Sequence, residues 1–218
     1  MIETASGLIL RTRPLTETSV IVHWLTPQLG RVATVAKGAR RPKSPFRGKL
    51  DLFFQADFSF VRSRRSELHT LREVSLGRTH AGLREDLGRL QQAAYAAALI
   101  EQTTETDAPL PGLYDLFHGF LAWVAAAPAS PRTIFSFELK LLGELGLQPD
   151  LTQSRLQPGT VLIIGKLQDN DWAAVGRLKL GPAQIREICN FLDGFLIYHL
   201  ERIPAGRLNA LGDMSGSY

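Results

Sequence analysis

Residues 19–38, SVIVHWLTPQLGRVATVAKG, decide the fold that this chain is expected to adopt. The run 19–25 is rich in β-branched and aromatic residues, which favour strands. Residues 27–30, PQLG, are typical of a turn, and the run that follows them alternates with a period of two. The stretch therefore predicts two strands joined by a short turn.

Three more strands are expected around this pair, at 6–12, 50–61 and 66–76. The last two are joined by the turn RSRRS, and no helical pattern occurs within the first 80 residues. An open sheet of five short strands would leave edges that need protection, so the pattern favours a small closed barrel. A barrel of the oligonucleotide-binding (OB) type is the leading interpretation for residues 1–80.

From residue 80 onward the hydrophobic pattern becomes helical. An alanine-rich segment at 88–103 and an apolar stripe at 113–124 predict two helices. A third has Ser130 as its N-cap, Pro131 at its first position and Gly146 at its end, and a last one starts near Pro182. Between these two, 151–180 is expected to be a small irregular or β insertion, with strand-like runs at 159–165 and 172–178. The fold class is therefore α+β, an OB barrel at 1–80 followed by a helical domain at 81–218.

The overall composition is that of a globular protein, with 218 residues, 44% hydrophobic and 21% charged. Cys189 is the single cysteine, so neither an intramolecular disulfide nor a zinc site built from cysteine pairs can form. The histidines are scattered, so we expect no metal and no cofactor. Since no signal sequence or stretch of about 18 apolar residues occurs, we expect a protein of the reducing cytoplasm without a membrane segment.

Positive charge is concentrated in the first part of the chain. Residues 1–80 contain 14 Lys and Arg against 6 acids, a net charge of +8, whereas the remaining 138 residues contain 11 against 15, a net charge of −4. Such an asymmetry indicates that the N-terminal part faces a polyanion.

The strongest functional feature is the segment 37–49, KGARRPKSPFRGK, which has six cations and no acids. Its glycines and prolines disfavour regular structure, so it is expected to be a loop. A solvated basic loop without a partner is the alternative. A second basic cluster lies in the turn 62–66, and on a small barrel both loops can flank one face. The expected nucleic-acid contacts are Lys37, Arg40, Arg41, Lys43, Arg47, Lys49, Arg62, Arg64 and Arg65.

Phenylalanines near these loops are candidates for stacking on bases, as in oligonucleotide-binding barrels. They are Phe46, Phe54, Phe58 and Phe60. The competing interpretation is that they fill the barrel, because alternate positions of a barrel strand point inward.

Enzyme motifs are poorly represented. The sequence contains no GxSxG, P-loop or GxGxxG motif. A nuclease would need clustered carboxylates beside the basic groove, where only Asp51 and Asp57 lie near in sequence. Asp169 and Asp171 have the composition of an ordinary turn, and Cys189 lies on an apolar helical stripe, as a buried cysteine does. We therefore expect a binding protein and no catalytic residue.

The order of these parts resembles the RecO family of bacterial recombination mediators. The resemblance rests on the opening stretch 7–44, on FELKLLGELGLQPDL at 137–151 and on FLDGFLIYHLER at 191–202. Many members have a CxxC…CxxC zinc module after the LG-x-x-P segment. Here Ser154 and Gln157 stand where a cysteine pair would be expected, so the zinc is expected to be absent.

The resemblance implies a non-enzymatic DNA-repair protein that binds single- and double-stranded DNA. It also implies action with RecR, contact with the C-terminal tail of the single-strand binding protein SSB, help in loading RecA, annealing of complementary strands, and a cytoplasmic, nucleoid-associated location. Apolar stripes near Arg132 and Lys140 are the expected site for the acidic SSB tail, unless the core consumes them. An RNA-binding barrel is the alternative within binding proteins, and a metal-dependent nuclease is the alternative among enzymes.

Overall fold

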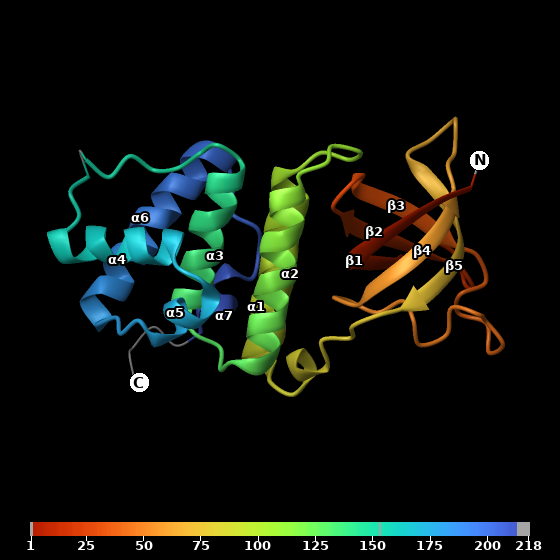
Figure 1. Cartoon of the computed structure of the whole chain (residues 1–218), viewed down its shortest axis with the longest axis horizontal. Coiled ribbons are helices and arrows are strands. Elements are labelled where there is room, and N and C mark those ends of the chain that lie inside the picture. The colour runs from red at the N-terminus through yellow and green to blue at the C-terminus, as the bar shows by residue number, and fades with distance from the viewer. Residues whose placement is uncertain (1, 153, 213–218) are drawn as a thin grey trace. The chain divides into compact units, whose positions relative to one another are not determined.

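The computed structural model describes residues 2–152 and 154–212 (Figure 1). The chain divides into two compact units. The first contains the residues up to His80 together with Ile100–His118, and the second contains Ala81–Leu99 together with the residues from Gly119 onward. The expected division into domains at residue 80 stays a prediction.

Five strands close into a barrel in the first unit, as predicted. They are β1 (Ile2–Pro14), β2 (Val20–Thr26), β3 (Gly30–Ala36), β4 (Gln55–Val61) and β5 (Leu68–Leu76). Their order around the barrel is β1-β2-β3-β5-β4, in which β3 and β5 are parallel and the other pairs antiparallel. This is the OB-type barrel expected from the sequence.

Aromatic side chains fill the barrel interior. Trp24 and Phe58 stack with ring centroids 4.0 Å apart, and the Trp24 indole N–H donates to Thr34 Oγ1 at 2.9 Å. The indole is fully buried, so this hydrogen bond satisfies its one polar atom. Alternation along β4 places Phe58 and Phe60 inside and Asp57 outside.

The barrel order determines where the basic loop lies. Because β5 separates β3 from β4, the chain after Ala36 must cross one end of the barrel to reach Gln55 (Figure 1). The segment 37–54 makes this crossing, and it contains the six cations of 37–49.

Helices follow the barrel: α1 (Leu87–Thr103), α2 (Pro111–Ala126), α3 (Pro131–Glu144), α4 (Pro158–Asp169), α5 (Trp172–Arg177), α6 (Pro182–Leu200) and α7 (Arg207–Leu211), with a 3-10 turn at Ala81–Arg84. Pro131 and Pro182 begin their helices as predicted, and Gly146 follows α3 with φ of +70°. Ser130 precedes α3, but its side chain makes no capping hydrogen bond. No helix of the described residues is long and apolar enough to cross a membrane.

The expected β insertion at 151–180 is wrong, because the runs 159–165 and 172–178 lie in α4 and α5. Pro158 occupies the first turn of α4, and Thr160, Ile164 and Leu167 then fall on one buried face. Asp171 accepts a hydrogen bond from the Ala174 N–H at 2.7 Å and so caps α5. Burial of this helical face outweighs the strand preference of the β-branched residues.

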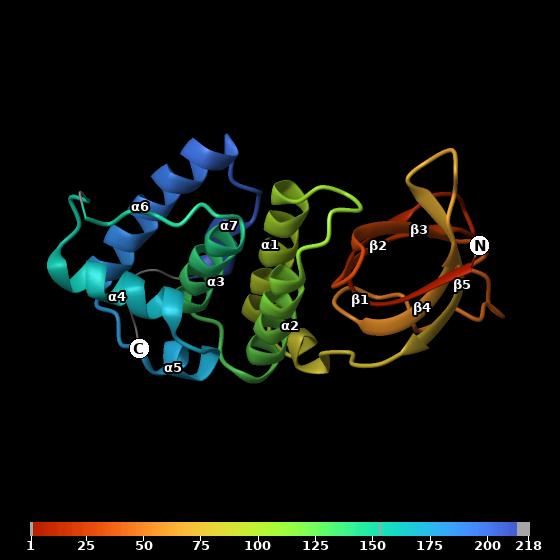
Figure 2. The ribbon, with the colours of Figure 1, turned by 45° about the horizontal axis from the view of Figure 1, so that its top comes forward.

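Helix α3 is the centre of the second unit. It packs against α4, α5, α6 and α7, and most of its residues are buried (Figure 2). Helix α4 is attached to its neighbours by hydrogen bonds, since Ser136 Oγ on α3 donates to Leu167 O at 2.6 Å, and Glu187 on α6 accepts from the Gln157 N–H at 2.8 Å. These contacts show how this segment folds without cysteine ligands.

Candidate nucleic-acid interface and partner pocket

The basic loop 37–49 is built from successive tight turns. Gly38 and Gly48 adopt φ of +69° and +73°, which is the left-handed conformation that glycine adopts without strain. Four backbone hydrogen bonds of 3.0 to 3.2 Å each join a carbonyl to the N–H three residues later. The donors are Arg41, Ser44, Arg47 and Lys49, and the acceptors are Gly38, Arg41, Ser44 and Phe46.

Three contacts attach this loop to the barrel. Phe46 is 7% exposed and belongs to the barrel core. The Arg40 N–H donates to Thr18 O at 2.9 Å in the β1–β2 loop, and Lys49 Nζ donates to Val74 O at 3.0 Å on β5. The loop is therefore fixed at its start, middle and end. The Lys49 ammonium makes one of these contacts, so it is less available to a ligand than the other cations of the loop.

The other five cations of the loop are exposed. They are Lys37, Arg40, Arg41, Lys43 and Arg47. None of them forms an ion pair with an acid in the part of the chain that the structure describes. Five unpaired positive charges on one loop form an electrostatic site for a polyanion such as a nucleic-acid backbone.

In the second basic cluster, Arg62 is paired with acids of the barrel unit. Its Nε and Nη2 donate to the two carboxylate oxygens of Glu3 at 2.8 and 3.1 Å, and its Nη1 donates to Asp107 Oδ1 at 3.2 Å. The hydrogen bonds with Glu3 raise the pKa of Arg62 and lower the pKa of Glu3. Arg62 is thus engaged within the barrel unit, whereas Arg64 and Arg65 are exposed.

Strand β4 separates the two basic clusters. The turn 62–66 follows the end of β4, whereas Lys49, the last cation of the loop 37–49, donates to Val74 O on β5. Val61 at the end of β4 pairs with Thr70, which at about 3.3 Å per residue lies about 13 Å along β5 from Val74. A nucleic acid that touches both clusters must therefore extend along the barrel.

The proposed base-stacking phenylalanines are all held by the barrel core. Phe46, Phe58 and Phe60 are buried, and Phe54 is partly buried against the same cluster. The structure therefore agrees with the interpretation that these residues fill the barrel, whose small interior needs their volume, and not with their use as a free stacking surface.

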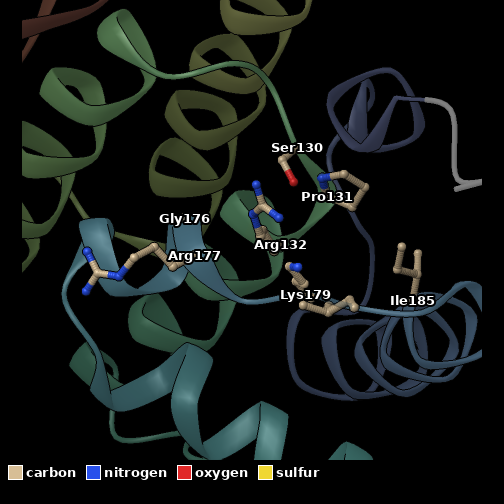
Figure 3. Close-up of a pocket in the computed structure, with 8 residues that line it drawn as sticks. Ser130, Pro131, Arg132, Gly176, Arg177, Lys179 and Ile185 are labelled. Atoms are coloured by element: carbon tan, nitrogen blue, oxygen red, sulfur yellow. The ribbon is translucent and has the colours of Figure 1, made fainter. Parts of the chain in front are cut away.

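The second unit contains a hollow of about 490 Å³ at the start of α3 (Figure 3). Figure 3 shows Arg132 beside Ser130 and Lys179, with Arg177 and Ile185 on either side. Arg132 Nη1 donates to Leu178 O at 2.8 Å, which holds its guanidinium in place. Arg177 and Lys179 were not identified from the sequence, since only the fold brings them to Arg132. The residues that line this hollow are Ser130, Pro131, Arg132, Gly176, Arg177, Lys179, Leu180 and Ile185.

Lys140 does not line this hollow. Its Nζ donates to Gln168 O at 2.7 Å and lies 5.8 Å from the centre of the Trp172 ring. Burial lowers the pKa of Lys140. The structure therefore brings Arg132, but not Lys140, to a concave surface.

Among the described residues, no three His, Cys, Asp or Glu side chains gather in a way that could hold a metal ion. Asp51 lines a hollow beside the basic loop, whereas Asp57 lines a different one, so the two carboxylates considered for a nuclease are not brought together. Cys189 is 4% exposed, in agreement with its placement on an apolar stripe.

Comparison with known proteins identifies the family. The model for the N-terminal part of recombination protein O matches residues 1–80, and the model for its C-terminal part matches residues 84–155. The DNA repair protein RecO of Alkaliphilus metalliredigens is 31% identical over 173 residues, which cover 79% of this chain and 67% of that protein. The chain belongs to the RecO family of DNA repair proteins.

Two further RecO proteins show how far the similarity extends. The DNA repair protein RecO of Anaeromyxobacter sp. strain K is 29% identical over 248 residues, covering 97% of this chain and 98% of that protein. That of Bacillus subtilis is 32% identical over 151 residues, covering 69% of this chain and 58% of that protein. The match to the C-terminal RecO model ends at residue 155, shortly before α4 begins.

Proposed function

We propose that this RecO-family protein is a non-enzymatic recombination mediator that binds DNA through the basic loop 37–49. It binds single- and double-stranded DNA, anneals complementary strands, and acts with RecR and SSB to promote RecA loading. The observation that carries the proposal is the set of five exposed cations on a loop attached to an OB barrel. Neutralising phosphates lowers the repulsion between two strands, so annealing needs no covalent chemistry.

A strand-annealing assay tests this function. Complementary oligonucleotides coated with SSB should anneal faster when the protein is added. The triple variant Arg40→Ala, Arg41→Ala, Lys43→Ala should lose most of this acceleration, because three phosphate contacts are removed.

The matched control removes three exposed charges from the second unit, with Arg155→Ala, Lys166→Ala and Arg186→Ala, and should anneal like the original protein. Annealing at the same rate with and without protein would contradict the proposal. A preference for RNA over DNA of the same sequence, in a competition at equilibrium, would favour an RNA-binding barrel instead.

The hollow at the start of α3 supports a second role, which we propose to be binding of the SSB C-terminal tail. Leu180 and the largely buried Pro131 and Ile185 form the apolar part of its lining. Three cations, Arg132, Arg177 and Lys179, also line it. An acidic peptide with a hydrophobic end has the complementary chemistry, and an arginine can hold a carboxylate with two hydrogen bonds.

Titration with a fluorescent SSB tail peptide tests this role. Arg132→Ala and Lys179→Ala should each weaken binding about tenfold, which corresponds to one lost charge-assisted contact. Lys166→Ala on the exposed face of α4 serves as the control and should bind like the original protein. Equal affinity of the original protein and the three variants for the peptide would show that the tail does not bind in this hollow.

A further inference from the structure

A second hollow, of about 610 Å³, lies beneath the basic loop 37–49 of the barrel. Its volume is within the range of small-molecule sites. Apolar side chains contribute to its lining, with Val20 on β2, Phe46 in the loop and Leu50 after it. Three arginines, Arg40, Arg41 and Arg47, also line it together with one acid, Asp51, so apolar surface and an excess of positive charge occur in the same concave site.

The apolar part of this hollow is held by the barrel. Phe46 is a member of the barrel core, and Val20, Ala39 and Leu50 pack against that core while remaining partly exposed. The barrel fold therefore fixes the shape of this apolar lining before any ligand binds.

The turns of the loop fix the backbone that carries the three arginines. The Arg40 N–H is bonded to Thr18 O, and the Arg41 side chain passes close to Gly38, where a Cβ would lie 3.5 Å from Arg41 Cδ. Arg47 Nη1 lies 3.4 Å from Pro42 O. The three arginines thus belong to one loop that is attached to the barrel, beside apolar side chains from that loop, from β2 and from the segment after the loop.

The two kinds of lining select different parts of a nucleotide. A phosphate placed against Val20, Ala39 and Leu50 would lose its hydration without gaining hydrogen bonds there, which is costly. A nucleobase has an apolar face that gains from leaving water, and its flanking phosphates can then meet the arginines. The lining therefore fits a base against the apolar surface and phosphates against the guanidinium groups.

We propose that this hollow receives one unstacked nucleotide of a single strand, an inference that rests on the proposed DNA-binding function. A base in a duplex is stacked and paired, so extruding it from the duplex costs free energy. The hollow therefore adds affinity for single strands, whereas the exposed cations attract both single strands and duplexes. The hollow thus gives the loop a preference for single strands over duplexes, which the positive charges alone do not provide.

An abasic oligonucleotide separates the base contact from the phosphate contacts. Fluorescence anisotropy would compare an oligothymidylate with an abasic strand of the same length and number of phosphates. The original protein should bind the oligothymidylate at least about fivefold more tightly, because the base removes apolar surface of the hollow from water and the abasic strand does not. Equal affinity for the two strands would overturn the nucleotide pocket.

Ala39→Leu adds volume inside the hollow without changing charge, and it should bring the affinity for oligothymidylate close to that for the abasic strand. Arg40→Ala with Arg41→Ala should instead weaken binding to both strands. A folded Ala39→Leu protein that still discriminates as before would place the base contact elsewhere and overturn the proposal. Failure of the original protein to bind either strand would contradict the proposed DNA-binding function as well, so the two failures are distinguishable.

Discussion

At the scale of single residues, the least exposed ionic contact described is that between Glu138 on α3 and Arg207 on α7. Arg207 Nε and Nη2 donate to the two oxygens of Glu138 at 2.6 and 2.8 Å, and Tyr95 donates its hydroxyl to Glu138 at 2.6 Å. Glu138 is fully buried and Arg207 is 4% exposed. The sequence does not indicate this pair, because 69 residues separate its members and each reads as an ordinary surface charge.

Arg207→Met should lower the free energy of unfolding by about 3 to 5 kcal/mol, because it leaves the Glu138 carboxylate buried without its cation. Adding Glu138→Leu and Tyr95→Phe, which removes the hydroxyl that donates to Glu138, should recover much of this loss, since apolar replacement of a whole buried ionic group is often neutral. Urea unfolding of both variants measures the effect. Arg186→Ala, at an exposed position, should change stability by less than about 0.5 kcal/mol. A loss below about 1 kcal/mol for Arg207→Met would show that the pair is dispensable.

Arg62 gives a pH-dependent prediction. Its hydrogen bonds lower the pKa of Glu3 from the ordinary value of 4.5. The stabilisation is therefore fully present above about pH 4.5 and is lost as the pH falls through the lower pKa of the folded state. Arg62→Ala should remove this contribution, so the variant should show a shallower loss of stability below pH 4.5. Because the pair is partly solvated, the difference should be about 1 kcal/mol or less. If the original protein and Arg62→Ala lost stability in parallel below pH 4.5, the ion pair with Glu3 would not contribute to stability.

At the scale of elements, the strands and the long helices follow from local pattern, and α4 does not. The period of two at 31–37 and the prolines before α3 and α6 are local signals, and the structure agrees with them. In α4 the run VLII resembles a strand, yet its helical form depends on burial of Ile164 and Leu167 against the rest of the unit. Tertiary packing of this kind is not visible in a short window of sequence.

Gly165, in the middle of α4, tests this assignment. A Cβ at this position would meet no atom within 4 Å, so a side chain is tolerated. Gly165→Ala should raise the free energy of unfolding by about 0.5 to 1 kcal/mol, and Gly165→Val should raise it less, because helices prefer alanine to valine. A strand would reverse the order of the two variants. Thermal unfolding of both proteins decides between helix and strand.

At the scale of the whole molecule, the uneven charge along the chain is the feature that sequence and structure describe together. The net charge of +8 in residues 1–80 predicts a polyanion partner, and the structure places five of those cations on one exposed loop. The sequence does not show that Arg62 pairs with Glu3 and Asp107. Nor does it show that Arg132, Arg177 and Lys179 line the same hollow, because both arrangements depend on the tertiary fold.

The salt dependence of DNA binding tests most directly whether the basic loop is the DNA interface. Each lost contact with a single strand changes the slope of log affinity against log salt by about 0.7. The variant Arg40→Ala, Arg41→Ala, Lys43→Ala should therefore have a slope shallower by about 2 for every DNA sequence, while the control Arg155→Ala, Lys166→Ala, Arg186→Ala keeps the original slope. An unchanged slope in the loop variant, with its fold intact by circular dichroism, would contradict the assignment.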